Sequence, residues 1–560
     1  MILNRTPLLA GAASVVALVL AEPAAAQTAT ALLREGDPLP AAGVGQAVTS
    51  INNTAVNGVG GYSATINTTD GVTTLSHAWG NATGGPGGIL LSEGLFGSLQ
   101  QTSWETFFGM DDAGNIAYSP SSDDTGSGAT GLDGAWLNGT VLANEDDPIP
   151  SLPGKVYRFN SRVGITNNGF AYWVAGINDQ ATGTSEGNGL ATAAGTILHK
   201  SGDVIPGLPS PLGSSAIDFD LRFSALATHY LVGVDTDAAS TADFFLLLDG
   251  VPLSTSAGLI GEGQPLPADA GGLAGENWDN FDFLGVNEAG DTMFTGDTDG
   301  AAATDEFIAF NGKIVYREGD VVDGETLTGS IEGATMNENC DIAYIWDIVD
   351  TINGGDVEAL FLNNKLLLKE GDAVDLDGDG VVEPTSIVAN FTGISALTMG
   401  PNRRLYFTAD IDVNGTSTTS DDIEGFFFLD DPCGSSVQRN GVGCVGSNGL
   451  VPSFALDGCL QNGSSVTLSL GNGQSFGTAA ILFGLSKGAT PIGPPDCTLN
   501  IGGVFGAPLF VPLDGTGSQL LAVPIAGLPS GATFSMQAFF GDGATPLGFV
   551  VSNGLRVVAG

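Results

Sequence analysis

The feature that most limits what this chain can fold into is a short acidic phrase that returns at a regular interval. "ALLREGDPLP" (31–40) recurs as "KIVYREGDVV" (313–322) and as "LLLKEGDAVD" (366–375). More divergent copies fill the gap, and the seven equivalent positions are Asp37, Leu95, Asp147, Asp203, Gln264, Asp320 and Asp372. Their spacings are 58, 52, 56, 61, 56 and 52 residues. A period near 56 residues over seven copies indicates stacked or radial supersecondary units.

Each unit carries two further markers. A polar turn precedes an aromatic residue in "DDAGNIAY" (111–118) and "NEAGDTMF" (287–294), whereas "LATHYLVG" (226–233) lacks the turn residues. An apolar run such as "EFIAFNG" (306–312) leads into the next acidic phrase. Asn, Asp and Gly favour tight turns between strands. One unit is therefore predicted to hold four short antiparallel strands.

The two ends of the repeat region complement each other. The last unit stops at "GFFFLDD" (425–431) without its final acidic strand, and the chain has an unmatched "ALLREGD" (31–37). We therefore predict an all-β fold in which residues 30–431 form a seven-bladed β-propeller. The N-terminal strand should complete the last blade, with Leu33 near Phe427 in one sheet, which leaves no exposed edge. A linear solenoid would need polar capping repeats, and none is evident.

The repeat ends near residue 431, and residues 432–560 are predicted to form a smaller β-sandwich. Short apolar runs separated by turn residues are typical of that fold. Four cysteines lie in this segment, namely Cys433, Cys444, Cys459 and Cys497. Their three connectivities stay open. Cys340 stands alone at a turn position and is predicted to be an unpaired thiol.

Residues 1–26 have the pattern of a signal peptide. Arg5 precedes an apolar run, which closes on Ala24, Ala25 and Ala26. No later apolar stretch is long enough for a transmembrane helix. We therefore expect an extracellular or cell-surface protein, with the periplasm as the alternative.

The charge of the chain limits its partners. It has 62 acidic and 16 basic residues, a formal net charge of −46. Such a surface repels phosphate backbones, so nucleic acid is not expected as a partner. An extracellular glycan or a surface protein is the expected partner class.

The phrase "DLDGDGVVE" (375–383) is the strongest local signal for a ligand. Alternating carboxylates before a glycine are typical of a calcium loop, in which hard oxygen ligands surround a hard cation. The predicted ligands are Asp375, Asp377, Asp379, Val381 and Glu383. Ser386 replaces the usual bidentate Glu, Pro384 lies at the tenth position, and no helices flank the loop. A solvated acidic loop is the alternative.

Two other patterns in the sequence are candidates for a catalytic or binding role. "GLSKG" (484–488) matches a nucleophile elbow, but every histidine lies upstream, so a turn at the end of a strand is predicted. Polar residues on the first strands of the units are candidates to face a ligand in the central channel. They are Glu105, Arg158, Asp220, Asp282 and Glu332.

The motifs "NEAGDTMF" and "NENCDIAY", with the recurring "EGD" phrases, resemble the secreted bacterial tandem-repeat proteins named for an NxxGxxAF repeat. The resemblance covers roughly residues 30–431. The end of the chain resembles a β-rich domain found at the ends of many secreted bacterial proteins, through "GCVGSNGLVPSF" (443–454) and "VSNGLRVV" (551–558). The resemblance implies export and extracellular residence, and it implies no activity.

We expect a non-catalytic binding or structural protein of the cell surface or extracellular matrix, with calcium as a candidate ligand. A fold alone does not name a function. The alternative is a secreted, carboxylate-dependent glycan-active enzyme. Such an enzyme needs two or three acids that converge at one end of the channel.

Overall fold

The computed structural model describes residues 28–559, apart from 352–353, 393–395, 402, 416–420, 431–435, 442, 449, 458–459, 461–463, 494–496 and 530. The predicted signal peptide (1–26) lies outside these residues. Within them the structure is all β, and its helical elements are two short 3-10 turns, η1 (Pro40–Ala42) and η2 (Ala268–Ala270). No helix among the described residues is long and apolar enough to cross a lipid bilayer.

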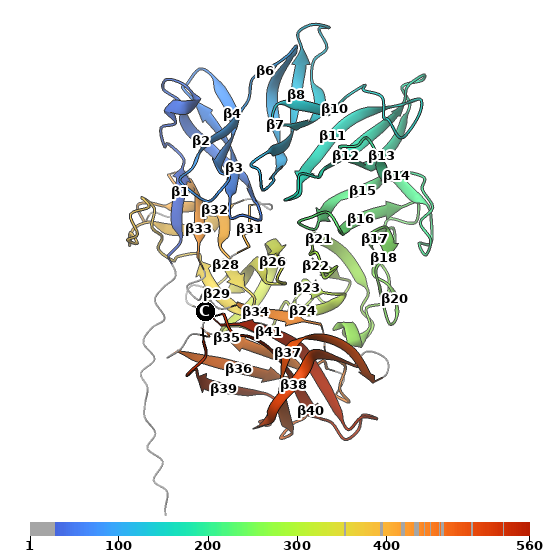
Figure 1. Ribbon diagram of the computed structural model, residues 1–560, viewed down its shortest axis with the longest axis vertical. Helices are drawn as coiled ribbons and strands as arrows, with labels where there is room; N and C mark the ends of the chain where they lie inside the picture. The colour runs from blue at the N-terminus through green and yellow to red at the C-terminus, as the bar shows by residue number, and fades with distance from the viewer. Residues whose placement is uncertain are drawn as a thin grey trace, which may run out of the picture.

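The described residues from 28 to 430 form seven antiparallel sheets of four or five strands, which follow one another round a central axis (Figure 1). The first sheet contains β2 (Ala47–Val56), β3 (Tyr62–Thr69), β4 (Thr74–Asn81) and β5 (Gly88–Ser92). The second contains β6 (Leu95–Phe96), β7 (Leu99–Met110), β8 (Ile116–Asp124), β9 (Leu132–Leu137) and β10 (Thr140–Asn144). The third contains β11 (Lys155–Ile165), β12 (Ala171–Asp179), β13 (Ser185–Thr192) and β14 (Ile197–Lys200).

The fourth sheet contains β15 (Leu212–Phe223), β16 (Tyr230–Thr236), β17 (Phe244–Leu248) and β18 (Val251–Pro252), followed by the small hairpin β19 (Ser254–Thr255) and β20 (Gly258–Leu259). The fifth contains β21 (Trp278–Val286), β22 (Thr292–Thr298), β23 (Phe307–Phe310) and β24 (Lys313–Arg317). The sixth contains β25 (Val321–Val322), β26 (Glu325–Met336), β27 (Ile342–Val349), β28 (Asp356–Leu362) and β29 (Lys365–Lys369). The seventh contains β30 (Ile387–Phe391), β31 (Thr398–Met399), β32 (Leu405–Asp412), β33 (Ile423–Leu429) and β1 (Thr30–Arg34).

The closing sheet joins the two ends of the repeat region, as predicted. β1 pairs antiparallel with β33, and Leu33 lies opposite Phe426 while Ala31 lies opposite Phe427. Leu33 is buried in a cluster with Tyr406 and Phe426. The prediction that Leu33 and Phe427 share one sheet is confirmed.

The recurring acidic phrase links neighbouring sheets through backbone hydrogen bonds. Asp37 accepts the backbone N–H of Arg34 through Oδ2 at 3.0 Å, and four other copies repeat this bond. Gly36, with φ +83°, then donates its N–H to Val48 O at 2.9 Å, and Val48 N–H returns to Asp37 O at 3.0 Å. The same pair of backbone bonds reaches the first strand of the next sheet in five further copies. At Leu95 the β6–β7 hairpin takes its place.

The polar turn of each unit also recurs in the backbone. One residue of each turn has a positive φ, and the seven are Gly60, Gly114, Gly169, Ala227, Gly290, Cys340 and Arg403. The expectation that "LATHYLVG" lacks the turn is wrong. Ala227, with φ +59°, donates to Ser224 O at 2.9 Å, and Ser224 N–H bonds His229 O at 2.9 Å. The left-handed conformation costs a non-glycine residue about 1–2 kcal/mol, which the surrounding backbone bonds offset.

Aromatic residues fill the spaces within and between the sheets. Trp173, Trp278 and Trp346 are fully buried. Trp104 is only half-buried, with its ring 4.4 Å from that of Tyr118. Cys340 is buried and unpaired, as predicted.

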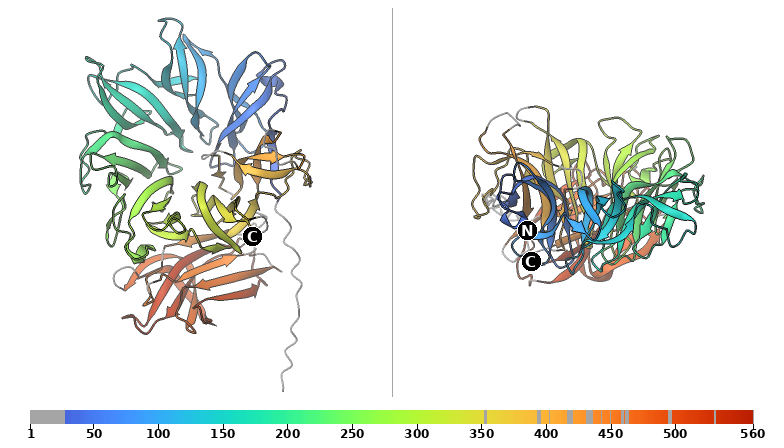
Figure 2. Two further views of the ribbon diagram at one scale, coloured as in Figure 1. Left: turned by 180° about the vertical axis from the view of Figure 1, so that it is seen from behind. Right: turned by 90° about the horizontal axis from the view of Figure 1, so that it is seen from above.

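Residues after 435 form two further sheets that share one hydrophobic cluster. They contain β34 (Ser436–Asn440), β37 (Thr478–Gly493), β38 (Cys497–Pro512), β40 (Thr533–Gly541) and β41 (Phe549–Val558), and β35 (Ser453–Asp457), β36 (Ser465–Gly471) and β39 (Gln519–Pro524). Both sheets lie against the outside of the ring (Figure 2). Lys313 of β24 donates to Gly443 O at 3.0 Å across this contact.

"GLSKG" lies in the interior of β37, so the predicted turn at the end of a strand is wrong. Gly484 pairs with Val504 and Lys487 with Ile501 in the long β37–β38 ladder. The glycines suit this ladder because the Cβ of any larger residue at 484 would lie 2.7 Å from Gly502 O.

A disulfide joins Cys444 to Cys497, 53 residues apart, while Cys433 and Cys459 lie outside the described residues. Replacing both bonded cysteines by serine should lower the free energy of unfolding of the tail by about 3–4 kcal/mol, since the closed loop no longer restrains the unfolded chain. Urea denaturation followed by circular dichroism measures the loss. Cys340→Ser is the matched control, and equal midpoints for the double variant and the oxidised parent would contradict the expectation.

Candidate functional site

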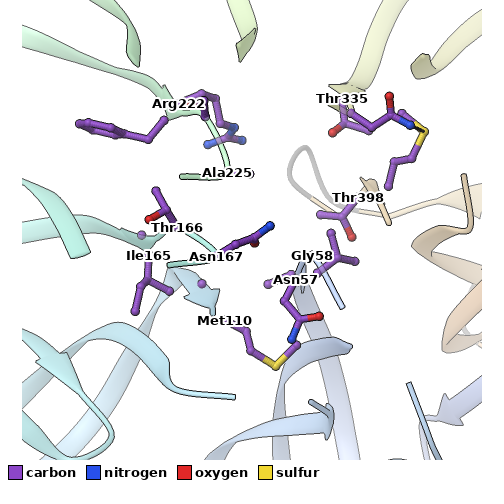
Figure 3. A pocket seen from close by; sticks show the side chains of 18 of the residues that line it. Asn57, Gly58, Met110, Ile165, Thr166, Asn167, Arg222, Ala225, Thr335 and Thr398 are labelled. Atoms are coloured by element: carbon purple, nitrogen blue, oxygen red, sulfur yellow. Dashed lines mark hydrogen bonds between the residues drawn. The ribbon is translucent and has the colours of Figure 1, made fainter. Parts of the chain in front are cut away.

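A cavity of about 590 Å³ lies on the axis of the ring. Every one of the seven sheets contributes to its wall through its innermost strand or the turn that follows, as Figure 3 shows in part. The wall segments are 53–58, 107–110, 164–167, 222–225, Phe283 with Val286, 334–339 and 397–399. The cavity is therefore a product of the whole ring.

The rim of the cavity is a chain of hydrogen bonds between successive turns. Gly58 N–H donates to Asp112 Oδ1 at 2.7 Å. Asp112 N–H donates to Asn167 O at 3.0 Å, and Asn167 N–H donates to Ala225 O at 2.8 Å. On the other side, the Glu338 carboxylate accepts the N–H of Ala225 at 3.1 Å and a second backbone N–H at 2.7 Å. The rim holds the turns in fixed positions.

The acids of the cavity are engaged in this rim. Asp112 and Glu338 are the acidic residues among the described lining residues. Asp112 accepts one backbone N–H group, and Glu338 accepts two, one on each of its oxygens. A carboxylate held in this way stabilises a turn and is poorly placed to exchange a proton with a substrate.

The rest of the wall combines aromatic rings with neutral polar groups. Phe223 and Tyr172 lie with ring centroids 4.4 Å apart. Arg162, which is not among the lining residues, places its guanidinium 3.9 Å from the ring centroid of the lining residue Phe107. Thr398 Oγ1 lies 3.0 Å from Thr54 Oγ1. This mixture is typical of small-ligand sites.

Arg222 is the basic residue of the described cavity wall, and its guanidinium extends towards the cavity centre in Figure 3. The sequence carries a signal that could have found it. Arg222 stands two residues before the turn of its unit, and the other six units have Ala55, Gly109, Gly164, Gly285, Thr335 and Thr398 there. Arg222 is therefore a large charged residue at a position where the other six units have a small neutral residue.

The five channel residues predicted from the sequence are placed differently. Arg158, Asp282 and Glu332 lie on β11, β21 and β26 as expected, but they are not among the residues that line the cavity. Arg158 instead lies 4.9 Å from the centroid of the Phe159 ring. The side chains of Glu105 and Asp220 lie outside the described residues.

The structure brings the four predicted carboxylate ligands of the acidic loop together. One oxygen each from Asp375, Asp377, Asp379 and Glu383 lies within 4.8 Å of all the others. Asp375 is fully buried, and its two oxygens accept the N–H groups of Gly378 at 2.8 Å and Gly380 at 2.9 Å. Val381 lies in the same loop and donates its N–H to Asp379 Oδ1.

The acidic loop lies against the closing strand of the ring. Ala31 N–H donates to Asp375 O at 2.9 Å, and Asp375 N–H donates to Ala29 O at 2.9 Å. The backbone of Asp375 is thus bonded on both sides of Thr30, with which it forms a parallel bridge. Order in the loop and order in β1 are therefore linked.

The glutamate of the acidic phrase belongs to a second recurring feature. Three successive sheets place one acid on, or directly beside, each of their last three strands, in the groups Asp297–Glu306–Glu318, Asp347–Glu358–Glu370 and Asp410–Glu424–Glu35. Burial, and then the carboxylate of Asp297, raises the pKa of Glu306 to about 9. Burial and neighbouring acids raise the pKa of Glu358 and of Glu424 to about 7.

Comparisons with known proteins add little to this geometry. No family model matches the chain, and no curated protein matches it. Three similar solved structures are an exo-β-1,3-galactanase from Phanerochaete chrysosporium with galactose (12% identity, 75% of this chain and 97% of that one, TM-score 0.18), a eukaryotic initiation factor (11%, 82% and 97%, 0.27) and the polysaccharide lyase Uly1 (10%, 74% and 90%, 0.23). TM-scores this low establish neither a shared fold nor a shared activity.

Proposed function

We propose that this chain is an exported, non-catalytic binding protein of the cell surface or extracellular matrix, built as a seven-bladed β-propeller with a C-terminal β-sandwich. The axial cavity is its ligand site. The observation that supports binding over catalysis is the use of Asp112 and Glu338 as acceptors for backbone N–H groups. Carboxylates bonded to turns in this way are less suited to the acid–base pair that a glycan hydrolase needs.

The expected ligand is an extracellular glycan, because aromatic faces and neutral polar groups line the wall. A glycan array probed with the protein lacking residues 1–26, followed by product analysis of every glycan that binds, tests this. Binding without product release supports the proposal. Release of shortened products would establish the competing glycan-active enzyme, and an array without binding would remove the proposed function.

Export and family membership are parts of the same proposal. The signal-peptide pattern and the NxxGxxAF resemblance support them, and the disulfide fits an oxidising compartment. Localisation of a tagged full-length chain in the secreting cell, together with the N-terminal sequence of the recovered protein, tests export.

Calcium in the loop 375–383 is the second part of the proposed function. The four carboxylates supply hard oxygen ligands in one small volume. A bound cation would also offset the repulsion between these acids, and so stabilise the loop that holds β1.

Removing calcium should therefore lower the melting temperature of the protein, and adding it back should restore the original value. At a hundredfold excess over the dissociation constant, a bound ion adds about 3 kcal/mol to the free energy of unfolding. Scanning calorimetry with and without EDTA measures the difference. The matched control carries Asp377→Asn and Asp379→Asn at two exposed positions and should not respond. A parent protein with the same melting temperature in both buffers would refute the calcium site.

A further inference from the structure

We propose that the axial cavity selects a carboxylated sugar, a uronate residue, through the guanidinium of Arg222. This inference rests on the proposed function, because it takes the axial cavity as the ligand site. It adds the chemical class of the ligand and the residue that discriminates it from a neutral sugar.

The first support is the state of Arg222 itself. The side chain is exposed although it stands in the cavity wall, and Nη1 donates to the adjacent Leu221 O at 3.1 Å. It forms no ion pair with any side chain that the structure describes. Several other basic residues of the ring are paired, among them Arg34 with Asp37 and Arg317 with Glu276.

The overall charge makes this arrangement unusual. The chain has 62 acidic and 16 basic residues, so carboxylates that could pair with an arginine are in large excess. The cavity nevertheless leaves the guanidinium of Arg222 with donors directed into an open space. A guanidinium matches the geometry of a carboxylate through two parallel hydrogen bonds.

The second support is the repeat position. The equivalent residue is small in the other six units, and five of these six also line the cavity. The ring therefore carries one positive group on one side of an inner wall whose two acids, Asp112 and Glu338, are bonded to backbone N–H groups. Such asymmetry gives a ligand one orientation.

The remaining wall fits the rest of a sugar acid. The rings of Phe223 and Tyr172 offer apolar faces beside Arg222, suited to the C–H face of a pyranose. Asn167 and Thr335 supply neutral polar groups for hydroxyls. A volume of about 590 Å³ lies in the range of small-ligand sites and suits one or two sugar residues.

Isothermal titration calorimetry on the protein lacking residues 1–26 tests the inference, with digalacturonate and its neutral counterpart galactobiose as probes. We expect digalacturonate to bind at least about tenfold more tightly than galactobiose. Arg222→Gln should remove this preference, while Arg222→Lys should keep part of it. Arg556→Gln, in the C-terminal sheets, is the matched control. Because the side chain of Arg222 is exposed, the variants should have the same melting temperature as the parent protein.

Three results would overturn the inference. Equal affinities for the acidic and the neutral disaccharide, or an Arg222→Gln variant that keeps the preference, would refute the role of Arg222. If neither disaccharide binds, the uronate class is wrong, whether or not the glycan array finds another ligand. A neutral glycan that binds on the array leaves the proposed function standing without this inference, whereas an empty array removes both.

Discussion

A chain that begins at Asp37, and so lacks β1, is expected to lose the cooperative unfolding transition of the ring. β33 then has an exposed edge with unpaired backbone groups, and the apolar cluster around Phe426 loses Leu33. Exposed edges of this kind pair with other chains, so the truncated protein should aggregate. Scanning calorimetry and size-exclusion chromatography, compared with the protein that begins at residue 27, measure both effects.

Point variants separate the contribution of the apolar cluster from that of strand pairing. Leu33→Ala should lower the free energy of unfolding by about 3 kcal/mol, whereas Arg34→Ala, at a half-exposed position, should lower it by less than about 1 kcal/mol. A synthetic peptide of residues 28–38 should restore a single transition to the truncated chain by adding the missing strand. A truncated chain that melts like its parent would show that β1 does not close the ring.

The protein is expected to be more stable at pH 5 than at pH 8. Burial and neighbouring acids raise the pKa of Glu306 to about 9 and the pKa values of Glu358 and Glu424 to about 7. A carboxyl whose pKa is higher in the folded state favours folding fully below its ordinary value of 4.5. That contribution falls as the pH rises, through about 7 for two of these groups and about 9 for the third. Melting temperatures between pH 5 and pH 9, at constant calcium, measure the slope.

Glu306→Gln isolates one of these groups. The acids that face Glu306 are Asp282, Asp297 and Asp305. The neutral amide removes its charge, so the variant should gain on the order of 2 kcal/mol over the parent at pH 9 and nothing at pH 5. Asp237→Asn, at an exposed acid, should leave the pH profile unchanged. A Glu306→Gln variant with the same pH profile as the parent would show that this carboxyl carries no charge penalty.

The strand pattern of the ring was accessible from the sequence because its signals are periodic. The spacing of the acidic phrase located the segments that link neighbouring sheets, and the unmatched copy at Asp37 indicated that β1 joins β33. The loop of Asp375 was also accessible, since its four carboxylates follow one another within nine residues. Local patterns of this kind need no knowledge of tertiary packing.

What sequence reasoning missed depends on contacts between units. The turn at Ala227 is imposed by backbone bonds, so its composition gave no indication of it. "GLSKG" lies inside a strand because the β37–β38 ladder extends past its glycines. The inner strands were expected to present five charged residues to the channel, but the cavity wall instead contains Arg222, two rim acids and several small residues. Which side chains meet at an axis depends on the twist of seven sheets, which a local pattern does not encode.

The seam between β1 and β33 also has a consequence for how the chain reaches its native state. Six of the sheets assemble from strands that are contiguous in the sequence, whereas Thr30 must find Phe428 across almost the entire ring. Bringing together such distant segments carries the largest loop-closure entropy in the molecule and slows the search. We expect the six local sheets to form early and the seam to form last, as the rate-limiting event. Until the seam forms, the ring is open and the edge of β33 is unpaired. A strand from a neighbouring copy of the chain can then compete with β1 for this edge.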